Sequence, residues 1–302
     1  GRLAASLGEP DRLISLRSSV KPFTAVAVLA AADEAGLALD DEMIALASAS
    51  HAGADEHIAV AQRMIDTFGL NPAHLVHGRP QSARGGSGEL LAHMCSGQHL
   101  SLLLLAQSIG VEGRGYDSYD HPVQLRIRAV VGELLGIDLS VAPWGMDGCA
   151  IPTYGVPLRA AAEGARRWAT PHDAQVPERY RALLERVRAA AVKNPRLISG
   201  AGFLDTDLIR GGEGAVVAKQ GAEGLCLVGL PGYGIAVRTE DGDAAARSGR
   251  VATVAVLDAI GANVAAAASL DSHRIVNLAD PRGGAALATV RPGESLMTLK
   301  VS

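Results

Sequence analysis

The sequence predicts an α/β protein in which strands from both chain ends form an antiparallel sheet around an inserted helical region. Strand-like runs occur near the start and in the last third, whereas helical patterns fill the middle. A doubly wound fold would alternate strands and helices throughout. No glycine-rich phosphate loop follows the first strand, so we expect no nucleotide cofactor. All 302 residues are expected to form one domain, with a helical subregion over about 90–200.

The first third of the chain passes from strands into helices. From Ser18 the apolar residues follow helical spacing, Pro22 suits a first turn, and Gly36 ends the pattern. A further helix follows Ser50-His51, and its His57 is expected at the surface. The other expected elements are a short strand before a turn at Gly8-Glu9-Pro10, a strand over 13–16 and a loop over 77–90.

The rest of the chain carries more helices and then strand-like runs. Pro122 follows His121 at a helix entry, which is a favoured place for proline. Alternating or continuous apolar runs separated by glycine indicate strands near the C-terminus. The expected helices cover 96–109, 122–136, 177–193 and 248–260, and the expected strands cover 214–219, 225–230, 235–238, 274–278 and 296–301.

Composition excludes several classes of function. The net charge is −4 and aromatic residues make up 3%, so neither a basic nucleic-acid surface nor a base-stacking platform is expected. The longest apolar runs fall far short of the about 20 residues that span a membrane. Three distant cysteines, with Cys226 in an apolar strand, favour reduced thiols and hence a cytoplasmic location.

Ser18 and Lys21 form an S-x-x-K motif where a strand passes into a helix. A spacing of three places both side chains on one helical face. A helix N-terminus favours a developing oxyanion, and a neutral lysine could take the serine proton. The motif alone is weak, because chance supplies such a string in a chain of this length, and a serine N-cap with a solvated lysine is then the favoured interpretation.

Ser50 and Lys219 add two further elements in a meaningful order. Penicillin-recognising enzymes carry S-x-x-K early, a serine-containing element next, and a K-T-G triad on a late strand. Here Lys219-Gln220-Gly221 follows a late strand-like run, and Ser50-His51 offers the middle serine. Gln220 departs from the triad, and a solvent-exposed lysine at a strand end remains the alternative for Lys219.

Two distant cysteines, Cys95 and Cys149, suggest a metal site. Thiolates and imidazoles are good zinc ligands, and His99 and Asp147 lie close to them in sequence. The spacing matches no zinc finger, so the zinc signal is weak by itself, and two buried structural cysteines, which are common, are the alternative.

Seven strings, in order, resemble the thermolabile, rhizobial-type L-asparaginases, the asparaginase II group with a serine β-lactamase-like fold. The resemblance runs from about residue 8 to 260, and the tail beyond about 265 matches only loosely. The strings are Leu16-Arg17-Ser18-Ser19-Val20-Lys21-Pro22-Phe23, Ala49-Ser50-His51-Ala52-Gly53, Cys95-Ser96-Gly97, Asp120-His121-Pro122-Val123-Gln124, Asp147-Gly148-Cys149, Leu204-Asp205-Thr206-Asp207-Leu208 and Lys219-Gln220-Gly221-Ala222-Glu223-Gly224.

The resemblance implies a homodimeric amidohydrolase that converts L-asparagine into L-aspartate and ammonia. It implies two Ser–Lys tandems, Ser18 with Lys21 as nucleophile and base, and Ser50 with Lys219 as the second pair. Which serine attacks is left open by the sequence. The implied substrate-binding residues are Arg17, His51, Asp147 and Gly221, and the implied zinc ligands are Cys95 and Cys149.

One departure from the family pattern affects the metal. The family carries a third zinc ligand, a lysine, in a C-S-G-K-H string, and Gln98 stands at that position here. An amide is a poor zinc ligand compared with a thiolate, an imidazole or a neutral amine. Zinc is therefore expected to be weakened, lost, or rebuilt with His99, His93 or water.

Two other functions stay open beside asparagine hydrolysis. Gln98 favours an amidase or acyl transferase that acts on another small amide. A catalytically weak binding or sensor homologue is the third hypothesis, but all four serine and lysine positions survive, which argues against it. Ammonia release from a panel of amides separates these functions.

Overall fold

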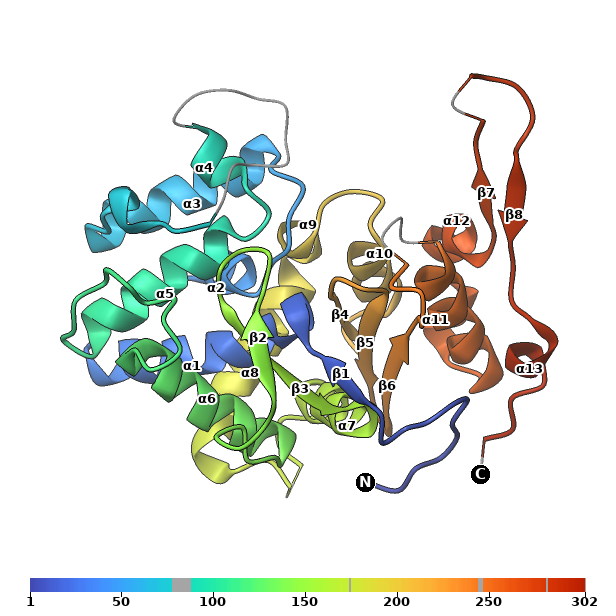
Figure 1. Cartoon of the computed structure of the whole chain (residues 1–302), viewed down its shortest axis with the longest axis horizontal. Helices are drawn as coiled ribbons and strands as arrows, with labels where there is room; N and C mark the ends of the chain where they lie inside the picture. The colour runs from blue at the N-terminus through green and yellow to red at the C-terminus, as the bar shows by residue number, and fades with distance from the viewer. Residues whose placement is uncertain (78–87, 174, 244–246, 281, 302) are drawn as a thin grey trace.

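The computed structural model describes residues 1–77, 88–173, 175–243, 247–280 and 282–301 (Figure 1). It is a mixed α/β structure with small antiparallel sheets and many helices. The sheets have the strand orders β1-β3-β2, β4-β5-β6 and β7-β8. The strands are β1 (Leu13–Ser15), β2 (Trp144–Met146), β3 (Pro152–Pro157), β4 (Val217–Gln220), β5 (Leu225–Leu230), β6 (Tyr233–Arg238), β7 (Val276–Leu278) and β8 (Ala288–Val290).

Helix α1 (Lys21–Glu34) lies inside the helical part of the molecule and is buried on most sides. It packs against α5 (Ser96–Ser108), α6 (Pro122–Leu135) and α8 (Glu178–Lys193). The other helices are η1 (Arg17–Val20), α2 (Asp41–Ala47), α3 (Asp55–Phe68), η2 (Pro72–His74), α4 (Gly88–Ala92), α7 (Leu158–Ala169), α9 (Pro195–Ile198), α10 (Leu204–Gly211), α11 (Ser248–Ala259), η3 (Asn263–Ala266), η4 (Ala268–Leu270), α12 (Asp271–Arg274) and α13 (Glu294–Met297).

Helices α7 and α11 cover opposite faces of the β4-β5-β6 sheet. A Cβ atom on Gly229 of β5 would collide with the carbonyl of Ala165 in α7, so only glycine permits this close packing. Cys226, three residues earlier and therefore on the other face, lies beside Thr253 of α11. The sheet is thus buried on both sides, and the prediction that Cys226 is a core residue is confirmed.

The prediction of one sheet built from both chain ends is wrong in its strand pairing. β1 pairs with β3 in the middle of the chain, with Ile14 opposite Val156, and not with the C-terminal strands. β4, β5 and β6 form their own antiparallel sheet. Strand partners are chosen by long-range packing, so local apolar patterns predict strands better than they predict pairing.

Individual elements agree with the sequence to different degrees. β5 has the predicted bounds, and α5, α6, α8 and α11 lie close to theirs. The strand expected before Gly8 is absent from residues 1–12, and the segment expected as a strand over 296–301 begins within α13. Helices α2 and α7 were not predicted, and residues 78–87 of the expected loop lie outside the described residues.

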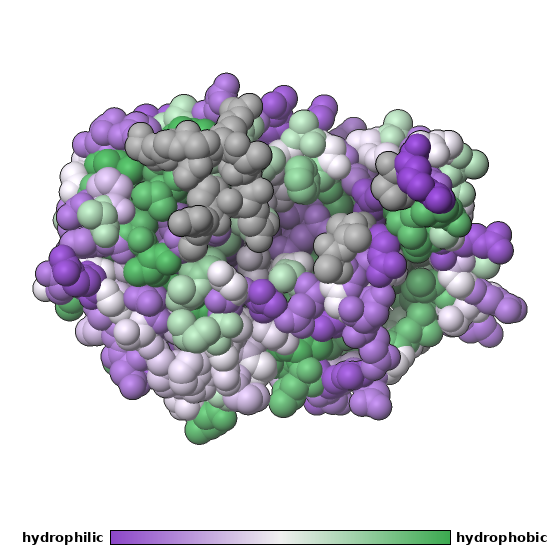
Figure 2. Space-filling model, turned by 45° about the horizontal axis from the view of Figure 1, so that its top comes forward, coloured by the Kyte–Doolittle hydropathy of each residue, from purple (hydrophilic) through white to green (hydrophobic). Residues whose placement is uncertain are grey.

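The surface is polar over most of the face in Figure 2, with apolar side chains in separate patches. Within the described ranges, no helix combines the length and apolar character needed to cross a membrane. β7 and β8 form a two-stranded hairpin that projects away from the rest of the molecule (Figure 1).

Candidate active site

Lys21 and Ser50 are in direct contact inside the molecule. The Lys21 Nζ atom lies 3.0 Å from Ser50 Oγ, 2.7 Å from the Ala49 carbonyl and 3.1 Å from Cys95 Sγ. The Lys21 side chain is almost fully buried, whereas Ser50 is half-buried. A buried lysine amine therefore faces a serine hydroxyl that remains accessible.

The local sequence explains how Lys21 reaches this position. Leu16 is fully buried and anchors the end of β1, after which the chain tightens into η1. Arg17 adopts a left-handed backbone conformation with φ of 47°, which is uncommon for a residue other than glycine. Pro22 then occupies the first turn of α1, where its missing N–H costs no hydrogen bond. Backbone strain of this kind often accompanies functional sites.

Lys219 is a second buried lysine, at the end of β4. Its Nζ atom donates to the Gln220 carbonyl at 2.7 Å and lies 3.5 Å from Asp205 Oδ2. Lys219 and Asp205 are both 0% exposed. Burial lowers the pKa of Lys219, the Asp205 carboxylate opposes this shift, and the positive charge of Lys21 adds to it. The two lysines are therefore close enough for their charges to act on each other.

The structure pairs Lys21 with a different serine from the one expected. Lys21 was predicted to pair with Ser18, but its hydrogen bond goes to Ser50, and none to the Ser18 hydroxyl is found within the described residues. Ser18 is half-buried in η1, three residues before Lys21. In this structure the lysine of the S-x-x-K motif thus contacts a serine other than the one three residues before it.

Gly221 holds the Lys219 strand against the Ser18 segment. A Cβ atom on Gly221 would lie 3.0 Å from the Leu16 carbonyl oxygen and 3.3 Å from the Ser19 nitrogen. These distances are too short for a side chain unless the backbone moves. Glycine at 221 therefore sets the separation between β4 and η1.

Replacing Gly221 with alanine is expected to widen this contact. We expect a loss of about 1–3 kcal/mol in the free energy of unfolding from overpacking, and a fall in kcat of about 10- to 100-fold from misplaced groups. Urea unfolding and steady-state kinetics measure the two effects. Gly293→Ala is the matched control, because nothing lies within 4 Å of a Cβ there. Equal effects of both substitutions would contradict the proposed spacing role.

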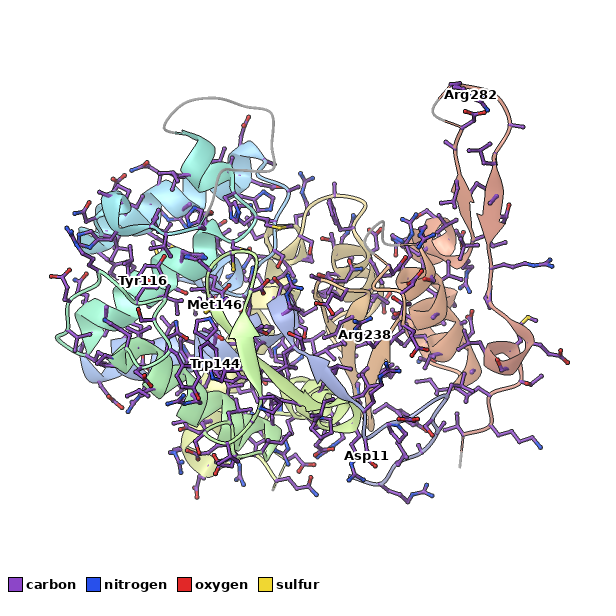
Figure 3. All side chains as sticks on the ribbon, viewed as in Figure 1. Asp11, Tyr116, Trp144, Met146, Arg238 and Arg282 are labelled. Carbon is purple, nitrogen blue, oxygen red and sulfur yellow. The ribbon has the colours of Figure 1, made fainter. Side chains whose placement is uncertain are left out.

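Arg17 and Asp147, two predicted substrate-binding residues, form an ion pair. Arg17 Nε lies 2.7 Å from Asp147 Oδ1, and Arg17 Nη1 lies 2.6 Å from Glu223 Oε1. Arg238 binds the other oxygen of Glu223 at 2.7 Å. In Figure 3, Met146 and Arg238 lie on either side of the segment that leads from β1 into α1. This chain of ion pairs ties the end of β2 to β6 across η1.

His51, the third predicted substrate-binding residue, has both ring nitrogens engaged within the protein. Its Nε2 lies 2.9 Å from Ser96 Oγ, and its Nδ1 accepts from the Gly53 N–H at 3.1 Å. The surface placement expected for His57 is wrong, because its ring is buried and stacks on His51 with centroids 4.6 Å apart. Burial and the neighbouring His57 lower the pKa of His51 well below its usual value.

Cys95 and Cys149 come together, as the resemblance implies. A hydrogen bond from Cys149 and the charge of Lys21 hold the pKa of the Cys95 thiol well below its usual range, whereas the hydrogen bond to Cys95 and burial raise the pKa of Cys149. Both thiols are free, without a disulfide. The pair can therefore share one negative charge beside Lys21.

The two thiols supply two of the ligands that a zinc site needs. Protein-bound zinc usually takes four ligands, mostly thiolate, imidazole or carboxylate. The third position of the motif is the buried amide Gln98; the His99 Nδ1 bonds the Tyr116 hydroxyl at 2.5 Å, whereas its buried Nε2 has no hydrogen-bond partner among the described residues. In the part of the chain that the structure describes, no three His, Cys, Asp or Glu side chains are arranged to hold a metal ion. The two thiols are the donors that fit.

Two surface depressions lie away from this cluster. One, of about 540 Å³, lies along α6 and residues 136–140, and the other, of about 260 Å³, lies beside residues 69–74. Neither depression is lined by the two buried lysines or by the two candidate serines. The cluster is therefore identified by its chemistry and contacts, not by the size of a cavity.

Fold and site together define an α/β protein with a buried pair of lysines beside an accessible serine. The sequence profile of the L-asparaginase II family matches residues 1–285. The chain therefore belongs to the L-asparaginase II family. A comparison with curated protein sequences gives no significant match.

Proposed function

We propose that this chain hydrolyses L-asparagine to L-aspartate and ammonia through a Ser–Lys site on a β-lactamase-like fold. Family membership supports an amidohydrolase, and the 3.0 Å contact between Lys21 Nζ and Ser50 Oγ is the observation that carries the proposal. A serine hydroxyl becomes a useful nucleophile only when a neighbouring base takes its proton.

Lys21 is the side chain placed to act as that base. Lys21 Nζ donates to the Ala49 carbonyl and to Ser50 Oγ and lies 3.1 Å from Cys95 Sγ, so its nitrogen is placed to exchange a proton with the Ser50 hydroxyl. Ser50 Oγ then attacks the side-chain amide carbon while its proton passes to Lys21. The proton moves on to the departing nitrogen, ammonia leaves, and water hydrolyses the resulting ester.

Lys219 is proposed to act as a buried positive charge for this reaction. Negative charge develops on the amide oxygen during attack, and a preorganised cation stabilises it in a site shielded from water. Asp205 at 3.5 Å favours the charged form of Lys219. Ser18, next to Arg17, stays a candidate for the second serine that the family pattern implies.

The direct test is ammonia release by purified protein from L-asparagine and a panel of small amides. Asparagine should be turned over fastest. Faster turnover of another amide would favour the second candidate, an amidase or acyl transferase, for which Gln98 at the metal motif is the supporting observation. No ammonia from any amide would exclude the proposed activity and leave the binding homologue.

Gln98→Lys is expected to raise the zinc content and asparagine turnover. Lysine restores an amine beside Cys95 and Cys149, which the amide of Gln98 does not replace well. Metal analysis of the purified wild type and variant measures zinc independently of activity. One tightly held zinc per chain in the wild type would contradict the weakened or lost zinc that we propose.

Several properties expected from the sequence or implied by the resemblance stay predictions. They are the homodimer, the cytoplasmic location, the rhizobial-type subgroup and the single catalytic domain. Light scattering of the purified chain tests the first of these, and a monomer at micromolar concentration would contradict it.

A further inference from the structure

Asp205 is a buried carboxylate whose two oxygens contact three residues in two other segments of the chain. Its Oδ1 accepts from the Gln220 backbone N–H at 3.0 Å. Its Oδ2 accepts from the Ser199 hydroxyl at 2.8 Å and lies 3.5 Å from Lys219 Nζ. It lies in the first turn of α10, where the helix field favours an anion. A fully buried carboxylate persists as an anion only with such compensation.

The contact with Gln220 explains how β4 ends. β4 is an edge strand, and Gly221 donates inward to the Leu225 carbonyl, so the Gln220 N–H points away from the sheet. The Asp205 carboxylate satisfies this outward donor with a charge-assisted hydrogen bond. Asp205 therefore fixes the backbone beside Lys219 as well as its ammonium group.

The contact with Ser199 extends the connection to the nucleophile segment. The Ser199 carbonyl accepts from the Ala52 N–H at 2.8 Å, and the Ile198 carbonyl accepts from the Ser50 N–H at 2.9 Å. These bonds hold the Ser50 segment beside residues 198–199. A single carboxylate thus links the Ser50 segment to the Lys219 strand.

We propose that Asp205 is a positioning residue that sets both the place and the charge of Lys219 relative to Ser50. This inference rests on the proposed Ser–Lys reaction and adds a residue to which the family resemblance assigned no role. Asp205 does not touch the reacting atoms, so it acts through Lys219 and through Ser199.

Asp205→Asn tests the charge with little change of shape. Asparagine can still accept from Gln220 and can donate to Ser199, but it no longer compensates the Lys219 ammonium. The groups that act on the Lys219 charge are Asp205, Lys21, Cys95 and Cys226, and Asp205 is the nearest carboxylate among them. The basic limb of the kcat/KM pH profile should move to lower pH by about 1–3 units, with a lower kcat and little change in KM.

Two further variants separate charge from structure. Asp207→Asn is the matched control, because Asp207 is a buried carboxylate on the same helix that bonds His273 at 2.9 Å and not Lys219. It should leave the pH profile unchanged. Ser199→Ala keeps the Asp205 charge but removes its link to the Ser50 segment. We expect a fall in kcat of about 10-fold or more without movement of the basic limb.

Thermal unfolding against pH tests the same proposal without a substrate. The pKa of Lys219 in the folded chain lies below its ordinary value of 10.5. At a pH between the folded and the unfolded pKa, the unfolded chain therefore binds more protons than the folded chain, and the free energy of unfolding rises with pH. In Asp205→Asn this rise should begin at lower pH. This measurement needs no enzyme activity. It can therefore support or contradict the role of Asp205 even if the chain releases no ammonia and the proposed function fails.

Three results would overturn the positioning role. The first is a pH profile of Asp205→Asn that superimposes on the wild type, together with an unchanged pH dependence of the unfolding temperature. The second is the same displacement in Asp207→Asn. The third, which decides the question if Asp205→Asn fails to fold, is an unchanged kcat in Ser199→Ala.

Discussion

Replacing Lys21 with methionine is expected to lower kcat/KM for L-asparagine by about 10²- to 10⁴-fold, the range for loss of a general base. Lys21 Nζ contacts Ser50 Oγ at 3.0 Å, and within the described ranges we find no other amine bonded to that hydroxyl. Methionine has a similar length and no charge, so it can fill the buried space that the lysine chain occupies. Folding should therefore persist while the proton acceptor is lost.

Lys193→Met provides the control for this experiment. Lys193 is exposed, pairs with Asp41 on the surface and has no role in the proposed reaction. Its removal should leave kcat/KM within about twofold, because surface ion pairs contribute little. A Lys21→Met protein that folds and keeps more than about a tenth of the wild-type kcat/KM would contradict the role of Lys21 as base.

Replacing Asp205 with alanine is expected to lower the free energy of unfolding by about 3–5 kcal/mol, which is typical when one partner of a buried pair is removed. The substitution removes the counter-charge of the Lys219 ammonium. It also removes the hydrogen-bond acceptor of the Gln220 N–H and of the Ser199 hydroxyl. The loss should shrink at alkaline pH, because Lys219 can then be buried as a neutral amine.

Urea unfolding at neutral and alkaline pH measures this loss. Asp33→Ala removes an exposed ion pair with Arg186 and should cost about 1 kcal/mol or less. If Asp205→Ala were no more destabilising than Asp33→Ala, the buried ion pair would not contribute as its geometry indicates.

Sequence patterns predicted elements well where large apolar residues or proline mark them. Pro122, directly after His121, predicted the start of α6. In the structure the His121 ring accepts a hydrogen bond from the Val123 N–H at this helix start. The run 225–230 predicted β5 with its observed bounds. Helix α7 was missed although its buried residues, among them Ala161, Ala165 and Trp168, recur at helical spacing.

Sequence motifs proposed the residues of the candidate site, but they did not predict the contacts that the structure shows among them. Motif order brought Ser50, Lys21 and Lys219 into one hypothesis, and the charges of the two lysines do act on each other. The Lys21–Ser50 bond depends on how α1 packs beside the residue 49–50 turn, which no local pattern encodes. Asp205 and Glu223 are part of the sequence strings that resemble the family. Only the ion pairs that they form in the structure, Asp205 with Lys219 and Glu223 with Arg17, indicate a role for them.

Mapping the acyl-enzyme tests the central claim most directly. Wild-type protein is quenched in acid during asparagine turnover and then digested with a protease that cleaves after acidic residues. Cleavage at Asp33 or Glu34 places Ser18 and Ser50 on different peptides. Mass spectrometry then locates the β-aspartyl ester. We expect the ester on the peptide that contains Ser50. An ester on the Ser18 peptide, or full turnover by Ser50→Ala protein, would contradict it.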